Sequence, residues 1–203
     1  MTYELVTADT LDTPQHETLR AIYEGGYAAG ERAPWRRVCT QRVDSDDAVA
    51  LLRGDEPVGF AALRGLTGSE HVFLRYLVID AAHRGQGLGA HFWSLLTSYA
   101  GRRGFRRLVW DVVVTDAPTD EDGHAATPQR IGFYERAGGS LVPIGEYADD
   151  SAERIRSTPV RLMTTAVDGS EDAIDERELR RLALDVYAYR YQLTADSAAE
   201  HET

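Results

Sequence analysis

The sequence predicts an α+β fold in which a twisted, mixed and mostly antiparallel sheet is flanked by helices. Short apolar or alternating segments typical of strands are interspersed with segments whose apolar residues recur every three or four positions, as in helices. Their order is strand, helix, paired strands and a central strand, helix, strand, helix, strand, strand, followed by one extra C-terminal helix. Strands joined directly to each other pair antiparallel, whereas strands joined through a helix can pair parallel, so this order indicates a mixed sheet.

The 203 residues are expected to form one domain, because this length is enough for a full hydrophobic core. Apolar residues make up 43% and charged residues 27% of the chain, which are ordinary values for a globular protein. We assign the domain to residues 1–192 and expect the polar residues 193–203 to be a disordered tail.

Composition excludes several classes of protein. No apolar run approaches the length of a membrane span, and the first residues lack the basic and apolar regions of a secretory signal, so we expect neither membrane insertion nor secretion. Cys39 is the only cysteine, which rules out an intramolecular disulfide and favours the cytoplasm. No cysteine and histidine spacing suggests a metal. The net charge of −11 disfavours nucleic acid as a partner; it favours a cationic substrate such as an amine, but fits simple solubility equally well.

The N-terminal half begins with an alternating segment, Tyr3 to Ala8, that is typical of a strand. Pro14 can open the next helix, because the first helical turn does not need the N–H that proline lacks. Residues 31–37 form a basic loop with Trp35 in its middle. Two strands follow, at residues 48–52 and 58–63, and the turn between them at residues 54–57 predicts that they form a hairpin.

The C-terminal half begins with the central strand, residues 71–79, and a long helix from Gln86 to about Arg103, which Gly104 can cap. The next elements are a strand at 108–114, a helix at 128–137 and strands at 140–144 and 158–167, with acidic loops at 115–127 and 146–153. The last segment, Glu171 to Tyr191, is a strongly patterned helix. We expect it to pack on the sheet or on a twin subunit, which would make the protein a homodimer.

A glycine-rich segment, His83 to Ala90, lies between the central strand and the long helix. Gly87 and Gly89 place no side chain before an approaching ligand, and the first turn of a helix leaves N–H groups unpaired, with a partial positive charge. Arg84 adds a full positive charge beside them. This combination suits a pyrophosphate.

Two other interpretations of this segment remain open. It can be a glycine turn with no ligand, or a dinucleotide-binding turn, because Gly85-x-Gly87-x-x-Ala90 fits the loose nucleotide fingerprint and Asp111 lies at a suitable distance for a ribose hydroxyl. The nucleotide fingerprint, however, places its first glycine directly after the strand, and here Asp80 to Arg84 intervene. Asp111 also lies inside a strand instead of at its carboxyl end.

The segment Leu77 to Gly89 resembles the acyl-CoA-binding motif of the GNAT superfamily of N-acyltransferases. That motif is Arg/Gln-x-x-Gly-x-Gly/Ala after a strand of the form Leu-x-Val-x-Pro, and every element has a counterpart here except the proline, which is Ala81. A second segment, Ile131 to Gly138, resembles the family's Phe/Leu-Tyr-Glu-Lys-x-Gly helix. The resemblance implies the family's fold, with a sheet that splays between the central strand (Leu74–Ile79) and the next one (Leu108–Val114).

The resemblance also implies acetyl-CoA or another acyl-CoA as co-substrate, without a metal, with pantetheine entering the splay and bonding to the strand backbone like an extra strand. The residues implied to bind it are Leu77, Val78, Ile79, Arg84, Gly85, Gln86, Gly87, Leu88 and Gly89. A strand amide near Leu77 or Val78 would stabilise the thioester oxygen, and Tyr134 matches the tyrosine that protonates the departing thiolate. A Tyr pKa of about 10 is close to that of the thiol, which would make this proton transfer nearly balanced.

The acceptor side is less determined by the resemblance. Trp35, with Arg36 and Arg37, lies in a segment that often forms one wall of the family's acceptor site, so these residues could touch substrate or the phosphates of CoA. A solvated loop with Trp35 packed onto the core is the favoured interpretation of this segment. Two departures from the family pattern, Thr127 in place of asparagine and Arg130 in place of alanine, indicate an unusual acceptor site.

The general base is also open. Many members carry a glutamate on the central strand near Arg75, which cannot act as a base but can bind a substrate carboxylate or pair with an acid. Asp111 on the adjacent strand is the first candidate base, and the next candidates are Glu70, His71 and His124. Some members have no dedicated base and let water remove the proton.

The sequence therefore predicts an N-acetyltransferase that moves an acetyl group from acetyl-CoA to a primary amine of a small molecule by direct attack in a ternary complex. An amino acid or an amino-sugar-like metabolite would satisfy both the acidic loops and Arg75. A protein N-terminus or lysine is the second candidate acceptor, and a non-catalytic acyl-CoA-binding module is the alternative class.

Overall fold

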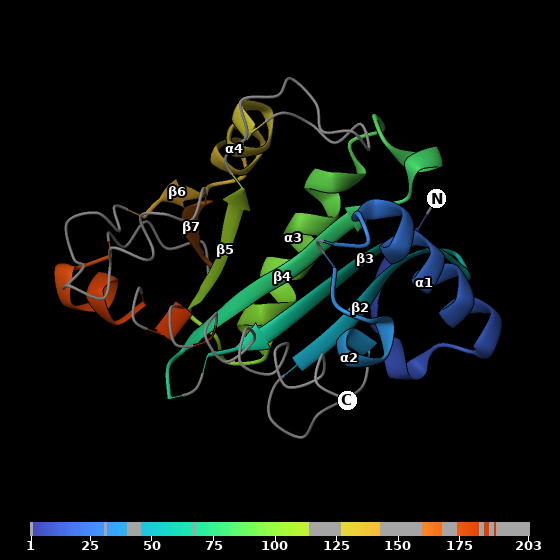
Figure 1. Ribbon diagram of the computed structural model, residues 1–203, viewed down its shortest axis with the longest axis horizontal. Helices are drawn as coiled ribbons and strands as arrows, with labels where there is room; N and C mark the ends of the chain where they lie inside the picture. Colours follow the sequence, from blue (N-terminus) through green and yellow to red (C-terminus); the bar gives the residue numbers. More distant parts are fainter. Residues whose placement is uncertain are drawn as a thin grey trace.

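The computed structural model describes residues 2–30, 32–39, 46–66, 68–113, 127–142, 160–167, 174–182, 185, 186 and 189 (Figure 1). Their strands form one sheet in the order β1-β2-β3-β4-β5-β7-β6. The strands are β1 (Tyr3–Thr7), β2 (Asp46–Arg53), β3 (Glu56–Gly65), β4 (His71–Ile79), β5 (Arg107–Val113), β6 (Ser140–Leu141) and β7 (Val160–Ala166). The helices are η1 (Ala8–Thr10), α1 (Thr13–Gly26), α2 (Trp35–Cys39), η2 (Ala81–His83), α3 (Leu88–Arg102), α4 (Thr127–Arg136) and a segment at residues 176–182.

All strand pairs in this sheet are antiparallel except β4 and β5, which makes the sheet mixed and confirms the predicted α+β class. The parallel ladder is short, because His71–Phe73 pair with Arg107–Val109 and no further pairs follow. Beyond this point β4 and β5 diverge (Figure 1). The predicted splay between the central strand and the next one is therefore confirmed, and we call the place where the two strands diverge the split.

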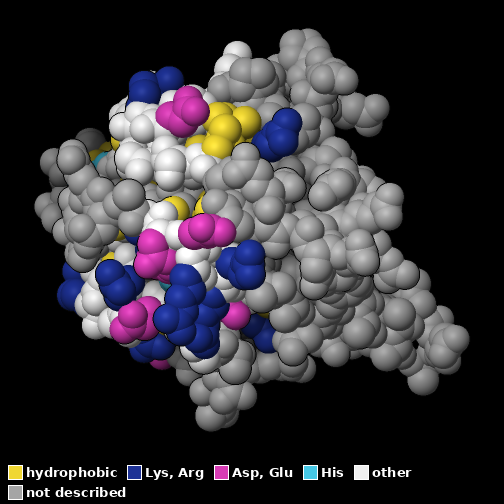
Figure 2. Space-filling view, turned by 90° about the vertical axis from the view of Figure 1, so that its left-hand side faces the viewer, with side chains coloured by type: hydrophobic (Ala, Val, Ile, Leu, Met, Phe, Trp, Pro, Cys, Tyr) yellow, Lys and Arg dark blue, Asp and Glu magenta, His cyan; other side chains and the backbone are white. Residues whose placement is uncertain are grey.

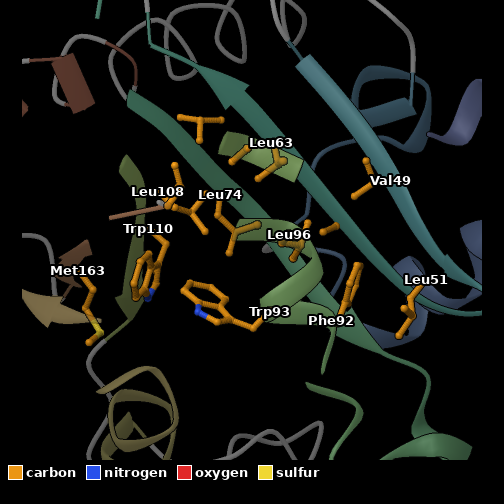
Figure 3. Packing of buried hydrophobic residues seen from close by; sticks show 14 of the residues in the cluster. Val49, Leu51, Leu63, Leu74, Phe92, Trp93, Leu96, Leu108, Trp110 and Met163 are labelled. Carbon is orange, nitrogen blue, oxygen red and sulfur yellow. The ribbon is translucent and has the colours of Figure 1, made fainter. Parts of the chain in front are cut away.

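Helices cover both faces of the sheet because successive strand residues point to opposite sides. On one face, Phe92, Trp93 and Leu96 of α3 pack against residues from most of the strands, and Figure 3 shows this core at close range. On the other face, α1 and α2 cover β2, β3 and the end of β4. The described C-terminal residues 174–182, 185, 186 and 189 cover β5, β7 and the start of β4 on that same face. The split thus lies between two helical layers.

Local sequence explains where the two longest helices begin and end. Asp12 caps α1 by accepting a hydrogen bond from Gln15 N–H, while the Gln15 side chain accepts one from Asp12 N–H. Gly87 is the N-cap of α3, with φ of 78°, so this helix begins at Leu88, not at Gln86 as predicted. Gly104 follows its end with φ of 86°, in the left-handed region that suits the predicted cap.

Two further expectations need correction or completion. The segment predicted as a basic loop contains a short helix, α2, because Trp35, Val38 and Cys39 recur at helical spacing and pack on the core beside α1. The C-terminal helix is seen at 176–182, and Leu179, Leu182, Val186 and Tyr189 are buried against the chain's own sheet. On the face of the molecule that includes this segment, side chains of both charges lie interspersed (Figure 2).

Several expectations fall on residues outside those described: the acidic loops at 115–126 and 146–153, residues 143 and 144 of the strand predicted at 140–144, and the predicted tail at 193–203. Thr127, predicted as the last residue of the first loop, is instead the first residue of α4. Among the helices that are described, none has both the length and the apolar character needed to cross a membrane.

Candidate active site

The backbone of β4 changes partners at the split. Asp80 N–H donates to Val58 O at 2.9 Å, and the β3–β4 register then pairs Val78 with Phe60. Because hydrogen-bonding groups alternate along an antiparallel pair, the N–H and C=O of Leu77 face away from β3, toward the split. Of the two amides predicted to stabilise the thioester oxygen, the structure thus places Leu77 at the split and turns Val78 toward β3.

A tyrosine that the sequence analysis did not single out occupies both backbone groups of Leu77. Leu77 N–H donates to Tyr27 Oη at 2.9 Å, and Tyr27 Oη donates to Leu77 O at 3.0 Å. The residues are separated by 50 positions, so no local pattern could have paired them. Burial raises the pKa of the Tyr27 phenol, and the hydroxyl therefore keeps its proton and can both donate and accept.

A bulge in β4 lies just before this point. Ala62 is opposite Tyr76 and Leu63 is opposite Leu74, so Arg75 is the extra residue of β4. A bulge re-aims the side chains beside it. The Arg75 guanidinium lies over the Tyr76 ring, 5.5 Å from its centroid. Arg75, the predicted carboxylate ligand, is therefore carried at the start of the diverging part of β4.

Trp35, the other predicted substrate residue, packs in an aromatic cluster. Its ring centroid lies 5.6 Å from that of Tyr23 and 5.4 Å from that of Phe60. Tyr23 in turn contacts both Tyr27 and Tyr76. The core-packing alternative for Trp35 is therefore the arrangement seen. Tyr23 lies between Trp35 and Tyr27, the tyrosine that bonds to Leu77 at the split.

The glycine-rich segment follows β4 and leads into α3. Gly85 and Gly87 have φ of 74° and 78°, and a Cβ on either would meet nothing within 4 Å. No side chain caps α3, so the N–H groups of its first turn are left for an anion. Arg84 is exposed, and its Nε donates to Ile79 O at 3.1 Å, which holds the guanidinium beside the end of β4. These features fit a pyrophosphate.

The remaining residues predicted in this segment have structural contacts. Leu88 is buried in the core under α3. A Cβ on Gly89 would lie 3.5 Å from the Phe133 ring of α4, so Gly89 lies where α3 and α4 pack together. Gln86 Nε2 donates to Ala82 O at 3.5 Å, within the turn itself.

Tyr134 reaches the split from the other face of the sheet. Its ring packs against Trp93 and Trp110, with centroids 5.1 Å and 4.8 Å away. Burial raises the pKa of Tyr134 to about 12, and the positive charge of Arg130, one turn earlier on α4, lowers it in part. Tyr134 is therefore a weaker acid than the nearly balanced proton donor expected from the sequence. The charge of an ionised Tyr134 also raises the pKa of Tyr27.

The candidate bases are spread over the fold. Asp111 follows Trp110 on β5, so its side chain leaves the sheet on the face opposite to Tyr134. Glu70 and His71 lie at the other end of β4 from Leu77: Glu70 pairs with Arg106 at 3.8 Å, and His71 Nε2 lies 3.3 Å from Glu178 Oε1. The structure thus does not bring Glu70 or His71 to the split. His124 lies outside the described residues, and within them no group of potential ligands could hold a metal ion.

Comparisons with known proteins agree with this geometry. A family model described as "Acetyltransferase (GNAT) family" matches residues 12–138. The fold is similar to that of the ribosomal-protein-S18-alanine N-acetyltransferase from Escherichia coli, with a TM-score of 0.55, 15% identity and coverage of 86% of this chain and 99% of that one. It is also similar to an acetyltransferase from Thermus thermophilus, with a TM-score of 0.55, 22% identity and coverage of 82% and 97%.

A third similar structure is an aminoglycoside 6'-N-acetyltransferase complexed with coenzyme A. Its TM-score is 0.56 and its identity 17%, over 85% of this chain and 100% of that one. Identities this low show a shared fold and nothing about the acceptor. No match was found among curated protein sequences.

Proposed function

The chain belongs to the GNAT acetyltransferase family, whose model matches well over half of its length, and from this premise we propose that it transfers an acetyl group from acetyl-CoA to a primary amine of a small molecule. The amine attacks directly in a ternary complex. The observation that carries the proposal is the backbone of Leu77, which faces the split between β4 and β5, together with Tyr134, whose ring packs on Trp110 of the adjacent strand β5. Nothing in a merely structural sheet requires strand edges to part at that point.

The chain's own groups can hold the two ends of acetyl-CoA. The first turn of α3 and the unobstructed backbone at Gly85 and Gly87 suit the pyrophosphate, with Arg84 as a fixed counter-charge. The N–H and C=O of Leu77 suit an amide of pantetheine, in the manner of an added strand. When bound, acetyl-CoA supplies a thioester whose carbonyl carbon accepts the amine.

Three groups then act on charge and protons. Because the pantetheine amide takes the N–H of Leu77, another N–H on this edge of β4 donates to the carbonyl oxygen as negative charge develops there; one such donor is worth about a hundredfold or more in rate. Tyr134 donates a proton to the departing sulfur. Asp111 removes a proton from the amine, directly or through a water, from the opposite face of the sheet. Acid and base thus serve different atoms without neutralising each other.

The acceptor we favour carries a carboxylate beside its amine. Arg75 is the cation at the bulge of β4, and the net charge of −11 favours approach of a protonated amine. An amino acid has a carboxylate for Arg75 and a protonated amine, and an amino sugar has the protonated amine alone. A protein N-terminus or lysine is the alternative acceptor. We retain a cytoplasmic location as an expectation that rests on the single cysteine.

The test is release of thiol from acetyl-CoA in the presence of amino acids, amino sugars and short peptides with free N-termini. The proposal expects turnover with at least one small amine, and turnover with peptides alone would favour the alternative acceptor. If acetyl-CoA binds but no amine supports turnover, the chain is the non-catalytic acyl-CoA-binding module. In that case Tyr134→Phe should change nothing measurable in acetyl-CoA binding or thiol release.

A further inference from the structure

The Tyr27 hydroxyl imitates one amide of a neighbouring strand. It accepts from Leu77 N–H at 2.9 Å and donates to Leu77 O at 3.0 Å, which is the pair of bonds that an added strand would make at a residue facing outward. Backbone groups at the edge of a sheet are strong donors and acceptors that need partners. Tyr27 thus satisfies the two backbone groups of Leu77, which lies beyond the β4–β5 ladder.

The fold holds Tyr27 against β4 through its backbone. Gly26, the last residue of α1, approaches β4 so closely that a Cβ there would lie 2.3 Å from Val78 Cγ2. Tyr27 follows in an extended conformation, with φ of −145° and ψ of 137°, which ends the helix. Its carbonyl accepts from Arg32 Nε at 3.1 Å. Its ring packs on the rings of Tyr23 and Tyr76, at 5.9 Å and 5.0 Å between centroids.

The contact has a consequence for any ligand that adds to β4. A backbone N–H can make only one strong linear hydrogen bond, so Tyr27 Oη and an incoming amide oxygen cannot both take the N–H of Leu77. Leu77 O has two lone pairs and can accept from two donors. The competition is therefore decided at the N–H.

We propose that Tyr27 competes with acyl-CoA for the backbone of Leu77, so that its hydroxyl must leave before pantetheine can bond to β4 and thereby lowers the affinity for acyl-CoA. The inference rests on the proposed function, since it requires acyl-CoA to be the ligand of the split. The role it gives Tyr27 is to set how tightly acyl-CoA binds. The rest of the site, including the pyrophosphate end at Gly85 and Gly87, does not depend on it.

The test compares Tyr27→Phe with Tyr23→Phe by calorimetric titration. The first substitution removes the competing hydroxyl and keeps the ring that packs on Tyr23 and Tyr76. The second removes a hydroxyl of the same cluster that donates to Ala33 O at 2.9 Å and has no bond to Leu77. Both variants are titrated with CoA, and with ADP, which has the pyrophosphate and no pantetheine amide.

The proposal expects Tyr27→Phe to bind CoA roughly fivefold more tightly than the unaltered protein, the effect of about one net hydrogen bond. ADP affinity should stay the same in that variant, and Tyr23→Phe should leave both affinities unchanged. Unchanged or weaker CoA binding by Tyr27→Phe, with CoA binding intact in the unaltered protein, overturns the competition alone. Failure of the unaltered protein and of Tyr27→Phe to bind CoA overturns the proposed function with it.

A second measurement needs no variant. The amide resonance of Leu77 should shift when CoA is added to nitrogen-labelled protein, because its acceptor changes from a phenol oxygen to an amide oxygen. ADP should leave that resonance in place. A Leu77 amide that does not respond to saturating CoA contradicts the proposal even if Tyr27→Phe fails to fold.

Discussion

Trp110 and Asp111 are consecutive residues of β5, and their side chains leave the sheet on opposite faces. Trp110 contacts the Tyr134 ring on the α4 side, at 4.8 Å between centroids. Asp111 shares its face with Val109, which packs in one cluster with Leu179 and Leu182 of the C-terminal helix. When the amine attacks the thioester directly, the attacking nitrogen and the departing sulfur are both bound to one tetrahedral carbon. A base and an acid on opposite faces of one strand can serve them separately.

Asp111→Asn tests this arrangement. We expect kcat/KM to fall about a hundredfold at neutral pH, because the variant can no longer take a proton from the amine. The loss should shrink at higher pH, where more of the amine is already deprotonated. Asp47→Asn is the matched control, since Asp47 lies on β2 and pairs with Arg103 at 3.3 Å. Equal kcat/KM for Asp111→Asn and the unaltered protein would remove Asp111 from the mechanism.

Tyr134→Phe should lower kcat about a hundredfold while leaving acetyl-CoA affinity almost unchanged, because the proton donor acts only as the sulfur departs. Burial raises the pKa of Tyr134 to about 12, so the phenol stays protonated and the deficit should persist into mildly alkaline pH. Tyr99→Phe on α3, whose phenol pKa is also raised to about 12, is the control. Steady-state kinetics measure kcat and calorimetry measures the acetyl-CoA affinity of both variants. An unchanged kcat in Tyr134→Phe would contradict the assignment of Tyr134 as proton donor.

The sequence predicted the parts of this site that are local. The apolar run from His71 to Ile79, the glycines after it and the helical spacing behind them lie within one stretch of chain, and the structure keeps all three. The split was also predicted, because the resemblance to the GNAT superfamily carries a fold with it.

What the sequence could not predict depends on contacts between distant segments. Tyr27 reaches Leu77 only because Gly26 lets α1 touch β4, and neither residue forms a motif by itself. The high pKa of Tyr134 likewise follows from burial beside Trp93 and Trp110, which come from two other elements. The short helix α2 was missed because its basic residues hid the apolar spacing of Trp35 and Val38.

Gly87→Ala should weaken acetyl-CoA binding roughly tenfold, about the loss of one charge-assisted hydrogen bond, since a side chain would stand where the pyrophosphate approaches. The change also places alanine at φ of 78°, which costs about 1 kcal/mol of stability or slightly more. Gly54→Ala is a close match, because Gly54 has φ of 61°, equally open surroundings and lies in the β2–β3 turn. Similar losses of acetyl-CoA affinity in both variants would mean that backbone strain, not the ligand, is responsible.

Glu178→Gln should lower the free energy of unfolding by about 2 kcal/mol, because Glu178 Oε1 is 3.0 Å from Nε of the buried Arg107 and 3.3 Å from His71. These contacts fasten the C-terminal helical segment to the start of β4 and β5. Glu70→Gln is the control: its pair with Arg106 is exposed, so its loss should cost almost nothing. Equal denaturant midpoints for the two variants would show that Glu178 does not hold the segment.

The central claim is that the split and the glycine turn form an acyl-CoA site. Calorimetric titration of the purified chain with acetyl-CoA, with NAD as the control ligand, tests it most directly. Micromolar binding of acetyl-CoA and no heat from NAD is the expected result. Binding of NAD alone, or of neither ligand, would contradict the account, because the glycine turn before α3 would then serve another purpose.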